Sequence, residues 1–192
     1  MKRVCVYCGS GKGDCGDYVD FARILGKTLA DEGIGIVYGG GRKGMMGALA
    51  HAALQSGGQV IGVIPQDLFD RGLGLTKATE LRVVDSMHTR KALMAELADA
   101  FIAMPGGLGT VEEFFEILTW SQLGLHQKAC GLLNVAGYFD HLIRLIDHMI
   151  DQGFAEPTDR SRFVVDDSPE ALLAKLRSLR VPGPSVFDRL QE

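Results

Sequence analysis

The sequence predicts an α/β protein with a mainly parallel, doubly wound sheet and helices on both of its faces. Short runs rich in Val and Ile alternate with longer segments whose apolar residues have helical spacing. This alternation builds a parallel sheet that is covered on both sides. Three of the short runs also end in glycine-rich turns. With 192 residues and no linker-like stretch, the chain is expected to form a single Rossmann-like domain.

The predicted strands are short and apolar, and most of them end at glycine, proline or a polar turn. They cover residues 4–8, 34–38, 60–64, 81–84, 101–104, 130–135 and 163–165. The predicted helices repeat apolar residues three and four apart, and they cover residues 18–32, 44–56, 87–97, 112–123, 139–152 and 169–179. Residues 66–79 lack either period and are expected to form a mobile loop near the site. We assign residues 1–180 to the domain and residues 181–192 to a peripheral tail.

The overall composition is that of an ordinary globular protein, and it narrows the classes of partner. Apolar residues make up 46% of the chain and charged residues 23%, so disorder is not expected. The formal net charge of −4 gives no basic field that would attract nucleic acid or an anionic membrane. The sequence shows no signal peptide and no run of about 18 apolar residues. We therefore expect a cytoplasmic protein with no nucleic-acid and no membrane partner.

Cysteine and histidine give no sign of a metal site. Cys5 and Cys8 form a CxxC, but it lies within a strand pattern rather than at a helix N-terminus, where a redox pair gains thiolate stability. No second CxxC and no convincing histidine pair completes a zinc set. We interpret the cysteines as ordinary buried thiols, and we expect neither a metal nor a cofactor.

The glycine-rich turns lie at residues 9–13, 39–44 and 105–109. The carboxyl ends of parallel strands meet at one edge of the sheet, so we expect the turns to gather at the edge where such folds bind ligands. Residues 39–44 match the pattern GxGxxG, but the next strand ends without the Asp or Glu that would hold a dinucleotide ribose. No Walker motif is present either. NAD and NADP are therefore disfavoured.

The third turn and its continuation, PGGLGTVEE at residues 105–113, are the most informative part of the chain. Backbone N–H groups at the start of a helix bind anions, phosphate above all, and the hydroxyl of Thr110 would add a donor. Glu112 and Glu113 are predicted to open this helix. Acids in a first turn commonly just complement the helix dipole. Beside a bound phosphate they would be repelled, so at least one is a candidate for chemistry.

Arg90 and Lys91 begin the helix after the fourth strand, which places them at the same predicted edge. They are either a solvated basic pair or a substrate contact, because a guanidinium meets phosphate or ribose oxygens with a fixed fork of donors. Thr119, six residues beyond Glu113, faces either the same site or solvent. Met45 and Met46 are expected in the core or in the lining of a pocket.

Three segments in this order resemble the LOG (Lonely Guy) family: GGGRKGMMG at 39–47, MHTRK at 87–91 and PGGLGTVEE at 105–113. The similarity runs from about residue 4 to residue 135 and continues weakly toward residue 176. It implies a phosphoribohydrolase, which hydrolyses the N-glycosidic bond of a cytokinin riboside 5′-monophosphate or AMP to free base and ribose 5-phosphate. Many members carry the label lysine decarboxylase. That reaction needs a Schiff-base lysine and a pyridoxal site, and the sequence displays neither.

The resemblance also implies the site residues. It makes Arg90 and Glu113 the catalytic pair, with residues 107–110 on the 5′-phosphate and Glu112 on ribose hydroxyls or facing outward. Cleaving a ribosyl–nitrogen bond creates positive charge on the sugar, which a fixed carboxylate stabilises while it orients or deprotonates water. The full set of predicted substrate-binding residues is Gly9, Ser10, Gly40, Gly41, Met87, Arg90, Lys91, Gly106, Gly107, Leu108, Gly109, Thr110, Val111, Glu112, Glu113 and Thr119.

The chain departs from the family's pattern at two places. Members often have a substrate-contacting Glu between the third and fourth strands, whereas residues 66–79 contain Asp67 and Asp70 instead. Ala129 stands where members usually have Pro. LOG-like proteins form homodimers and some form hexamers, so a homodimer or higher oligomer is expected, with the apolar helix at residues 114–125 as a candidate contact.

The alternative from a different functional class is a protein that binds a nucleotide or the molybdenum cofactor without catalysis. Carriers of this kind resemble the chain in fold and in their glycine turns. The Arg90–Glu113 pair that the resemblance implies favours an enzyme over a carrier.

Overall fold

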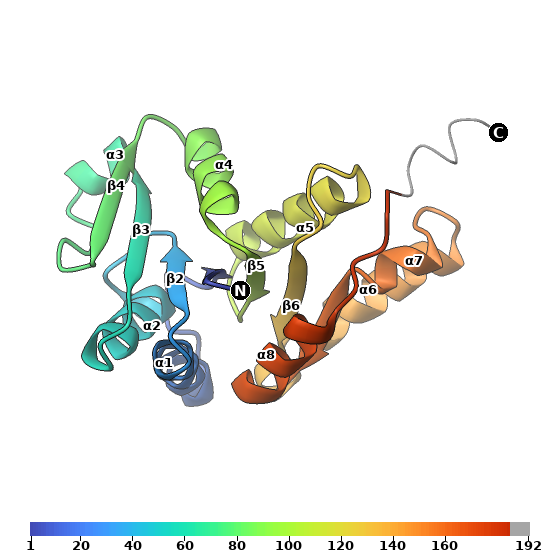
Figure 1. Ribbon diagram of the computed structural model, residues 1–192, viewed down its shortest axis with the longest axis horizontal. Helices are drawn as coiled ribbons and strands as arrows, with labels where there is room; N and C mark the ends of the chain where they lie inside the picture. The colour runs from blue at the N-terminus through green and yellow to red at the C-terminus, as the bar shows by residue number, and fades with distance from the viewer. Residues whose placement is uncertain (185–192) are drawn as a thin grey trace.

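The computed structural model describes residues 1–184, which form a parallel sheet between two layers of helices (Figure 1). Within these residues the sheet has seven strands in the order β4-β3-β2-β1-β5-β6-β7, and every neighbouring pair is parallel. The strands are β1 (Arg3–Tyr7), β2 (Gly35–Tyr38), β3 (Val60–Pro65), β4 (Glu80–Val84), β5 (Ala100–Ala103), β6 (Ala129–Leu133) and β7 (Phe163–Asp166). The predicted doubly wound fold is confirmed.

The helices connect successive strands, with α1, α2 and α8 on one face of the sheet and α4, α5 and α6 on the other. They are α1 (Gly16–Asp31), α2 (Gly44–Gln55), α3 (Gln66–Asp70), α4 (Met87–Leu97), α5 (Leu108–Gln122), the 3-10 turn η1 (Val135–Gly137), α6 (Asp140–Asp151), α7 (Pro157–Arg160) and α8 (Pro169–Ser178). The division into a domain at 1–180 and a tail at 181–192 stays a prediction, and most of that tail lies outside the described residues.

The strand order contains one reversal, and it fixes where a ligand can bind. The chain winds outward from β1 to β4, then crosses back so that β5 pairs with the other side of β1. The turns that follow β1 and β5 therefore diverge toward opposite faces and leave a crevice between them. Open α/β sheets bind their ligands at this switch point, beyond the carboxyl ends of the strands.

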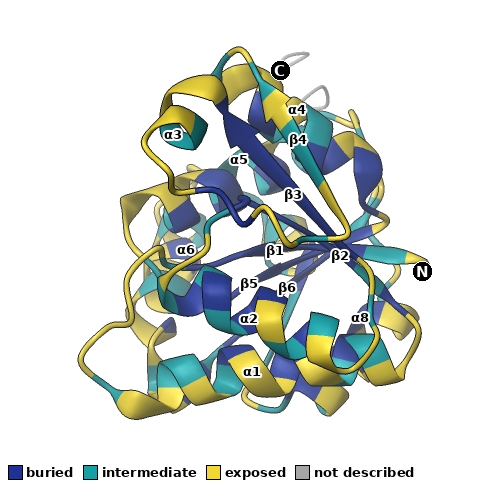
Figure 2. Ribbon diagram, turned by 90° about the vertical axis from the view of Figure 1, so that its left-hand side faces the viewer, coloured by how far each residue is buried: buried dark blue, intermediate teal, exposed yellow. Residues whose placement is uncertain are grey.

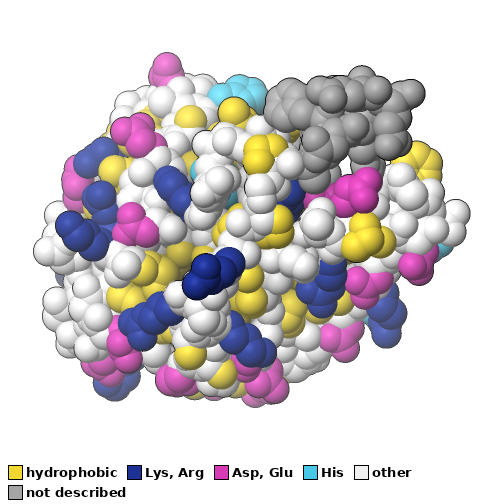
Figure 3. Space-filling model, turned by 45° about the vertical axis from the view of Figure 1, so that its right-hand side comes forward, with side chains coloured by type: hydrophobic (Ala, Val, Ile, Leu, Met, Phe, Trp, Pro, Cys, Tyr) yellow, Lys and Arg dark blue, Asp and Glu magenta, His cyan; other side chains and the backbone are white. Residues whose placement is uncertain are grey.

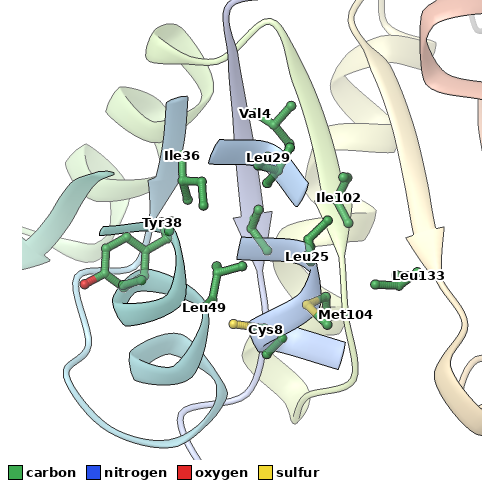
Figure 4. Packing of buried hydrophobic residues seen from close by; sticks show 14 of the residues in the cluster. Val4, Cys8, Leu25, Leu29, Ile36, Tyr38, Leu49, Ile102, Met104 and Leu133 are labelled. Atoms are coloured by element: carbon green, nitrogen blue, oxygen red, sulfur yellow. The ribbon is translucent and has the colours of Figure 1, made fainter. Parts of the chain in front are cut away.

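Alternate residues of the central strands enter two separate cores, as the two-residue period of a strand requires. Val4 and Val6 of β1 pack with α1, α2 and α8, whereas Cys5 and Tyr7 pack with α4, α5 and α6. Figure 2 shows the inner strand β3 buried along its length, whereas the edge strand β4 and the outer surfaces of α1 and α2 carry exposed residues. Figure 4 shows the first core between the sheet and α1 and α2, where Leu25 and Leu49 face the strands.

Two local differences from the predicted elements have physical causes. Residues 66–79, predicted as a loop, begin with the short helix α3. A helix of one turn has no apolar period to detect. Helix α5 begins at Leu108, so Glu112 and Glu113 lie in its second turn rather than at its start. Glycine in the motif concealed the true beginning of this helix, because glycine is a poor helix former.

The outer surface carries both signs of charge. Lys and Arg side chains are interspersed with Asp and Glu over the face seen in Figure 3. No helix among the described residues is long and apolar enough to cross a membrane.

Tyr38, the last residue of β2, offers a test of the packing. Its side chain is fully buried, and its hydroxyl has no hydrogen-bond partner within residues 1–184. A buried hydroxyl without a partner costs about 1–3 kcal/mol. We expect Tyr38→Phe to raise the free energy of unfolding by about 1 kcal/mol in urea denaturation. A variant that is less stable than the wild type would contradict this description of the core.

Candidate active site

The switch point holds a pocket between the first and third glycine turns. The backbone N–H of Gly9 donates to the carbonyl oxygen of Pro105 at 3.0 Å, which ties the two turns together. The pocket has a volume of about 370 Å³. Its lining residues are Gly9, Ser10, Gly11, Gly13, Tyr18, Met45, Pro105, Gly106, Gly107 and Tyr138. The first and third turns therefore meet as predicted.

The second glycine turn binds the segment that precedes β4 instead of lining this pocket. Gly40 adopts a left-handed conformation (φ 74°), and its carbonyl oxygen accepts from the N–H of Leu75 at 2.9 Å. Gly41 forms a bridge with Gly74. Neither glycine lines the pocket at the switch point. They hold residues 71–75 against the end of β2, so the segment that contains Asp67 and Asp70 is anchored beside the site. Substrate contacts of Gly40 and Gly41 stay predictions.

The second glycine turn leads into α2 and the third into α5, and these two helices differ in whether their first N–H groups are free. At α2, Met45 donates to the carbonyl of Gly11 at 3.0 Å and Met46 to that of Gly9 at 3.4 Å. At α5, in contrast, the N–H groups of residues 107–109 have no acceptor within the described chain. The start of α5 is therefore the one open to an anion, in agreement with the phosphate site that the PGGLGT motif predicts.

Arg90 is buried at the ends of β2 and β3, with its side chain 7% exposed. Its Nε donates to the carbonyl of Val63 at 3.2 Å, and its Nη2 donates to the carbonyl of Gly39 at 3.3 Å. The sulfur of Met87 accepts from Nη1 at 3.6 Å. The ends of β2 and β3 thus hold the guanidinium in one orientation, which is what a fixed fork of donors needs. The alternative of a solvated surface pair is wrong for Arg90.

Glu113 lies opposite Arg90 and is buried in the same degree. The closest distance between its Oε1 and the Nη2 of Arg90 is 3.9 Å. Burial raises the pKa of this carboxyl to about 7, against the lowering effect of Arg90. A carboxyl with a pKa near neutrality can exchange a proton during a reaction at physiological pH, and such shifts cluster at functional sites. At 3.9 Å the two side chains do not form a hydrogen bond with each other, so each can form one with a bound ligand.

Lys91 joins α4 to α5 through two ion pairs. Its Nζ binds Glu112 and also Glu116, the latter at 2.9 Å. Burial alone would lower the pKa of Lys91, but the hydrogen bonds that it donates to the two carboxylates raise the pKa above its usual value. The amine therefore stays protonated and is not poised to form a Schiff base. Glu112 is more than half exposed and balances this charge, which supports its interpretation as an outward-facing residue.

The other predicted residues of the third turn divide between buried and exposed positions. Thr110 is buried, and its hydroxyl packs so closely on Gly106 that a side chain there would collide with it. Leu108 and Gly109 are exposed, and Val111 is half-buried. Ser10 is exposed on the first turn, and Met87 is 46% exposed at the start of α4.

Thr119 lies elsewhere on α5. It is exposed and lines a second hollow of about 180 Å³. The other lining residues are Phe115, Leu118, Gln122, Ile146, Met149, Phe154, Ala155, Asp159, Arg162 and Phe163. The structure does not bring Thr119 into one pocket with the first and third turns, and its role in substrate binding stays a prediction. In the segment at residues 114–125, which was predicted as an oligomer contact, Phe114 and Ile117 are buried in the core of the same chain. Leu125 is 69% exposed and remains available for such a contact.

The structure adds residues that the sequence did not single out. Gly39 provides the carbonyl that orients Arg90. Glu116 shares Lys91 with Glu112. The hydroxyl of Tyr138 donates to the carbonyl of Gly106 at 2.5 Å. No local pattern reveals these contacts, because each joins segments more than 20 residues apart.

Two of the cysteines lie under the site and are inert. Cys5 and Cys8 are buried and free of disulfides. Burial raises the pKa of both thiols, that of Cys8 to about 12. Their thiols therefore stay protonated, which confirms their interpretation as ordinary buried thiols.

The chain is similar to known proteins over most of its length. A family model described as "Possible lysine decarboxylase" matches residues 46–176. The chain is 50% identical over 183 residues to the cytokinin riboside 5′-monophosphate phosphoribohydrolase of Rhodococcoides fascians, covering 92% of this chain and 90% of that protein. It is 47% identical over 176 residues to the phosphoribohydrolase LOG of Oryza sativa subsp. japonica, covering 92% and 73%.

Solved structures share the fold at much lower identity. The molybdenum cofactor binding protein of Rippkaea orientalis superposes with a TM-score of 0.70 at 21% identity, covering 93% of this chain and 97% of that one. The molybdenum cofactor carrier protein of Chlamydomonas reinhardtii gives 0.70 at 22% identity, covering 93% and 98%. Likeness at this level concerns the fold alone, whereas the family match covers most of the chain. The chain belongs to the LOG (Lonely Guy) family, whose model carries the lysine decarboxylase description.

Proposed function

We propose that the protein is a hydrolase that cleaves the N-glycosidic bond of a cytokinin riboside 5′-monophosphate or of AMP, releasing the free base and ribose 5-phosphate. The observation that carries the proposal is the buried Arg90–Glu113 pair beside the open start of α5. The names of the relatives that are 47–50% identical support the same reaction. The protonated Lys91 speaks against the decarboxylase description.

The substrate binds through its phosphate at the free N–H groups of residues 107–109. This contact places the ribose toward the buried pair, so that binding energy from the unreactive phosphate serves the reacting bond. In the reaction the bond between C1′ and the base nitrogen breaks, and a bond from C1′ to a water oxygen forms. Positive charge develops on the ribose ring as the base departs.

Glu113 acts in its ionised form. Its carboxylate stabilises the charge on the ribose and accepts the proton of the attacking water. Arg90 lies 3.9 Å from the carboxylate, and its donors compensate the negative charge that gathers on the departing base. The proton that Glu113 receives is then available to the leaving base, which leaves the enzyme in its starting state.

The raised pKa of Glu113 predicts an acid limb in the activity. Below about pH 7 the carboxyl becomes protonated, so kcat/KM is expected to fall by about tenfold per pH unit well below that value. The substrate phosphate also titrates near pH 6, so the pH dependence of kcat/KM combines both groups. The stability of the free protein, measured without substrate, reports on Glu113 separately.

The stability effect has a definite sign. The folded pKa of Glu113 lies above its ordinary value of 4.5, so the native state binds more protons than the unfolded state between about pH 4.5 and 7. This contribution to the free energy of unfolding is present below pH 4.5 and is lost as the pH rises through 7, by up to about 3 kcal/mol. Urea denaturation of wild type and Glu113→Gln across this window measures it. A constant difference between the two proteins would contradict the raised pKa.

The function is tested by incubating the protein with AMP, isopentenyladenosine 5′-monophosphate and adenosine, followed by chromatography of the free base. We expect base from one or both monophosphates and none from adenosine, because the nucleoside lacks the phosphate that anchors it. A carrier without catalysis would retain the monophosphates and release no base.

Three further features belong to this proposal. We propose a homodimer or a higher oligomer and a cytoplasmic location, and sedimentation velocity and cell fractionation test them. Which monophosphate the enzyme prefers depends on contacts with the base, and the assay above ranks the candidates. The molybdenum carrier alternative has only a fold likeness at 21–22% identity in its support.

A further inference from the structure

Tyr138 lines the pocket at the switch point but has no role in the reaction proposed above. It lies just before α6, and its hydroxyl reaches across to donate to the carbonyl of Gly106 at 2.5 Å. Gly106 belongs to the third glycine turn, so the bond ties the connection between β6 and α6 to the turn that begins α5. Gly106, Gly107 and Tyr138 line the same pocket of about 370 Å³.

The hydrogen bond fixes a peptide plane rather than a single atom. The carbonyl of Gly106 and the N–H of Gly107 belong to one planar trans peptide and point in opposite directions. Because Tyr138 holds the carbonyl, the N–H of Gly107 is directed away from the tyrosine. A flipped peptide would turn the carbonyl oxygen to the side where an anion binds, and the two negative groups would repel each other. Glycine on both sides of the peptide makes such a flip easy.

The position of Tyr138 is set independently of its hydroxyl. The preceding residues Ala136 (φ 51°) and Gly137 (φ 70°) both adopt the left-handed conformation, which is unusual for alanine. The side chain of Asn134 fixes this turn by accepting from the N–H of Phe139 at 2.7 Å. Backbone strain that the surroundings enforce is common where a fold positions a functional group.

Aromatic contacts hold the ring itself. Tyr138 meets Tyr18 of α1 edge to face with 5.5 Å between ring centroids, and it meets Phe139 in the same way at 5.1 Å. Gly13 makes room for this arrangement, because a side chain there would come within 2.7 Å of the Tyr18 ring. Removal of the Tyr138 hydroxyl therefore leaves the ring in place.

We propose that Tyr138 is a positioning residue: its hydroxyl orients the Gly106–Gly107 peptide so that the Gly107 N–H binds the phosphate of the substrate. The inference rests on the proposed function for the identity of the anion. It predicts an effect on phosphate binding and not on the chemical step, because the hydroxyl of Tyr138 bonds to the backbone of the third turn and not to the catalytic pair.

The test is Tyr138→Phe, with Tyr38→Phe as the matched control. Both changes remove one phenolic oxygen, but the hydroxyl of Tyr38 has no partner within residues 1–184 and is not part of the site. For Tyr138→Phe we expect KM for the monophosphate to rise about five- to tenfold with kcat within about twofold of wild type. The Kd of inorganic phosphate, measured by calorimetry, is expected to rise by the same factor. Tyr38→Phe is expected to change neither quantity.

Three results would overturn the proposal. The first is a phosphate Kd and KM within about twofold of wild type in Tyr138→Phe. The second is a fall in kcat and melting temperature at unchanged KM, which would mark a merely structural role. The third is a wild-type protein that binds no phosphate. If the wild type binds phosphate but releases no base from any monophosphate, the proposed hydrolysis fails while the phosphate measurement still tests Tyr138.

Discussion

Glu113→Gln is expected to reduce kcat by about 10³-fold while the Kd of AMP stays within about threefold of wild type. The amide has the shape of the acid but cannot become a carboxylate, so it neither stabilises a positive ribose nor accepts a proton from water. Phosphate binding is unaffected, because the N–H groups at the start of α5 do not depend on this side chain. Stopped assays for free base and calorimetry with AMP measure the two quantities.

Glu112→Gln is the matched control for this variant. It makes the same change at the adjacent position, where the carboxylate is exposed and paired with Lys91. Lys91 keeps Glu116 as a partner, so we expect kcat to stay within about fivefold of wild type. Turnover by Glu113→Gln close to that of the wild type would refute the role of the buried carboxylate. A loss in both variants would instead assign the effect to the charge of α5.

Gly39→Ala has the second-largest expected effect. A Cβ at this position would lie 1.9 Å from Nη2 of Arg90 and 3.1 Å from its Cζ, so the guanidinium must move. The backbone has room to remain as it is, because the closest atoms belong to the end of a long side chain. We expect a folded protein in which Arg90 is displaced. Its kcat/KM is expected to fall by about 10²-fold, because a shift of about 1 Å in a catalytic group reduces the rate by about that factor.

Gly16→Ala controls for the substitution itself. A Cβ at Gly16 meets nothing within 4 Å, and this first residue of α1 is not among those that line the pocket. The measurements are kcat/KM of both variants and crystal structures that show the position of the Arg90 guanidinium in each. If Gly39→Ala retains full activity with Arg90 in its original place, then the close approach of Gly39 is not what holds the guanidinium.

The fold could be predicted from the sequence because the same strand and helix patterns recur along the whole chain. Alternating Val-rich runs and helical patterns predict every strand, and parallel pairing follows from the crossover connections. The same reasoning places the first and third glycine turns at one edge, where the bond between Gly9 and Pro105 joins them. Arg90 and Glu113 meet because they lie in the first two turns of α4 and α5, which cover the same face of the sheet.

Contacts between distant segments could not be predicted. The bond of Tyr138 to Gly106 spans 32 residues, and it depends on a left-handed alanine that no propensity favours. The pairing of Lys91 with two acids depends on how α4 packs beside α5. Thr119 shows the limit of counting residues, because six residues along a helix place it roughly 120° around the axis from Glu113.

A crystal structure of Glu113→Gln with bound AMP tests the central claim most directly. We predict the phosphate on the N–H groups of residues 107–109 and the anomeric carbon within about 4 Å of the side chain at position 113, with Arg90 toward the base. A nucleotide bound with its phosphate elsewhere, or with its anomeric carbon far from this side chain, would contradict the account.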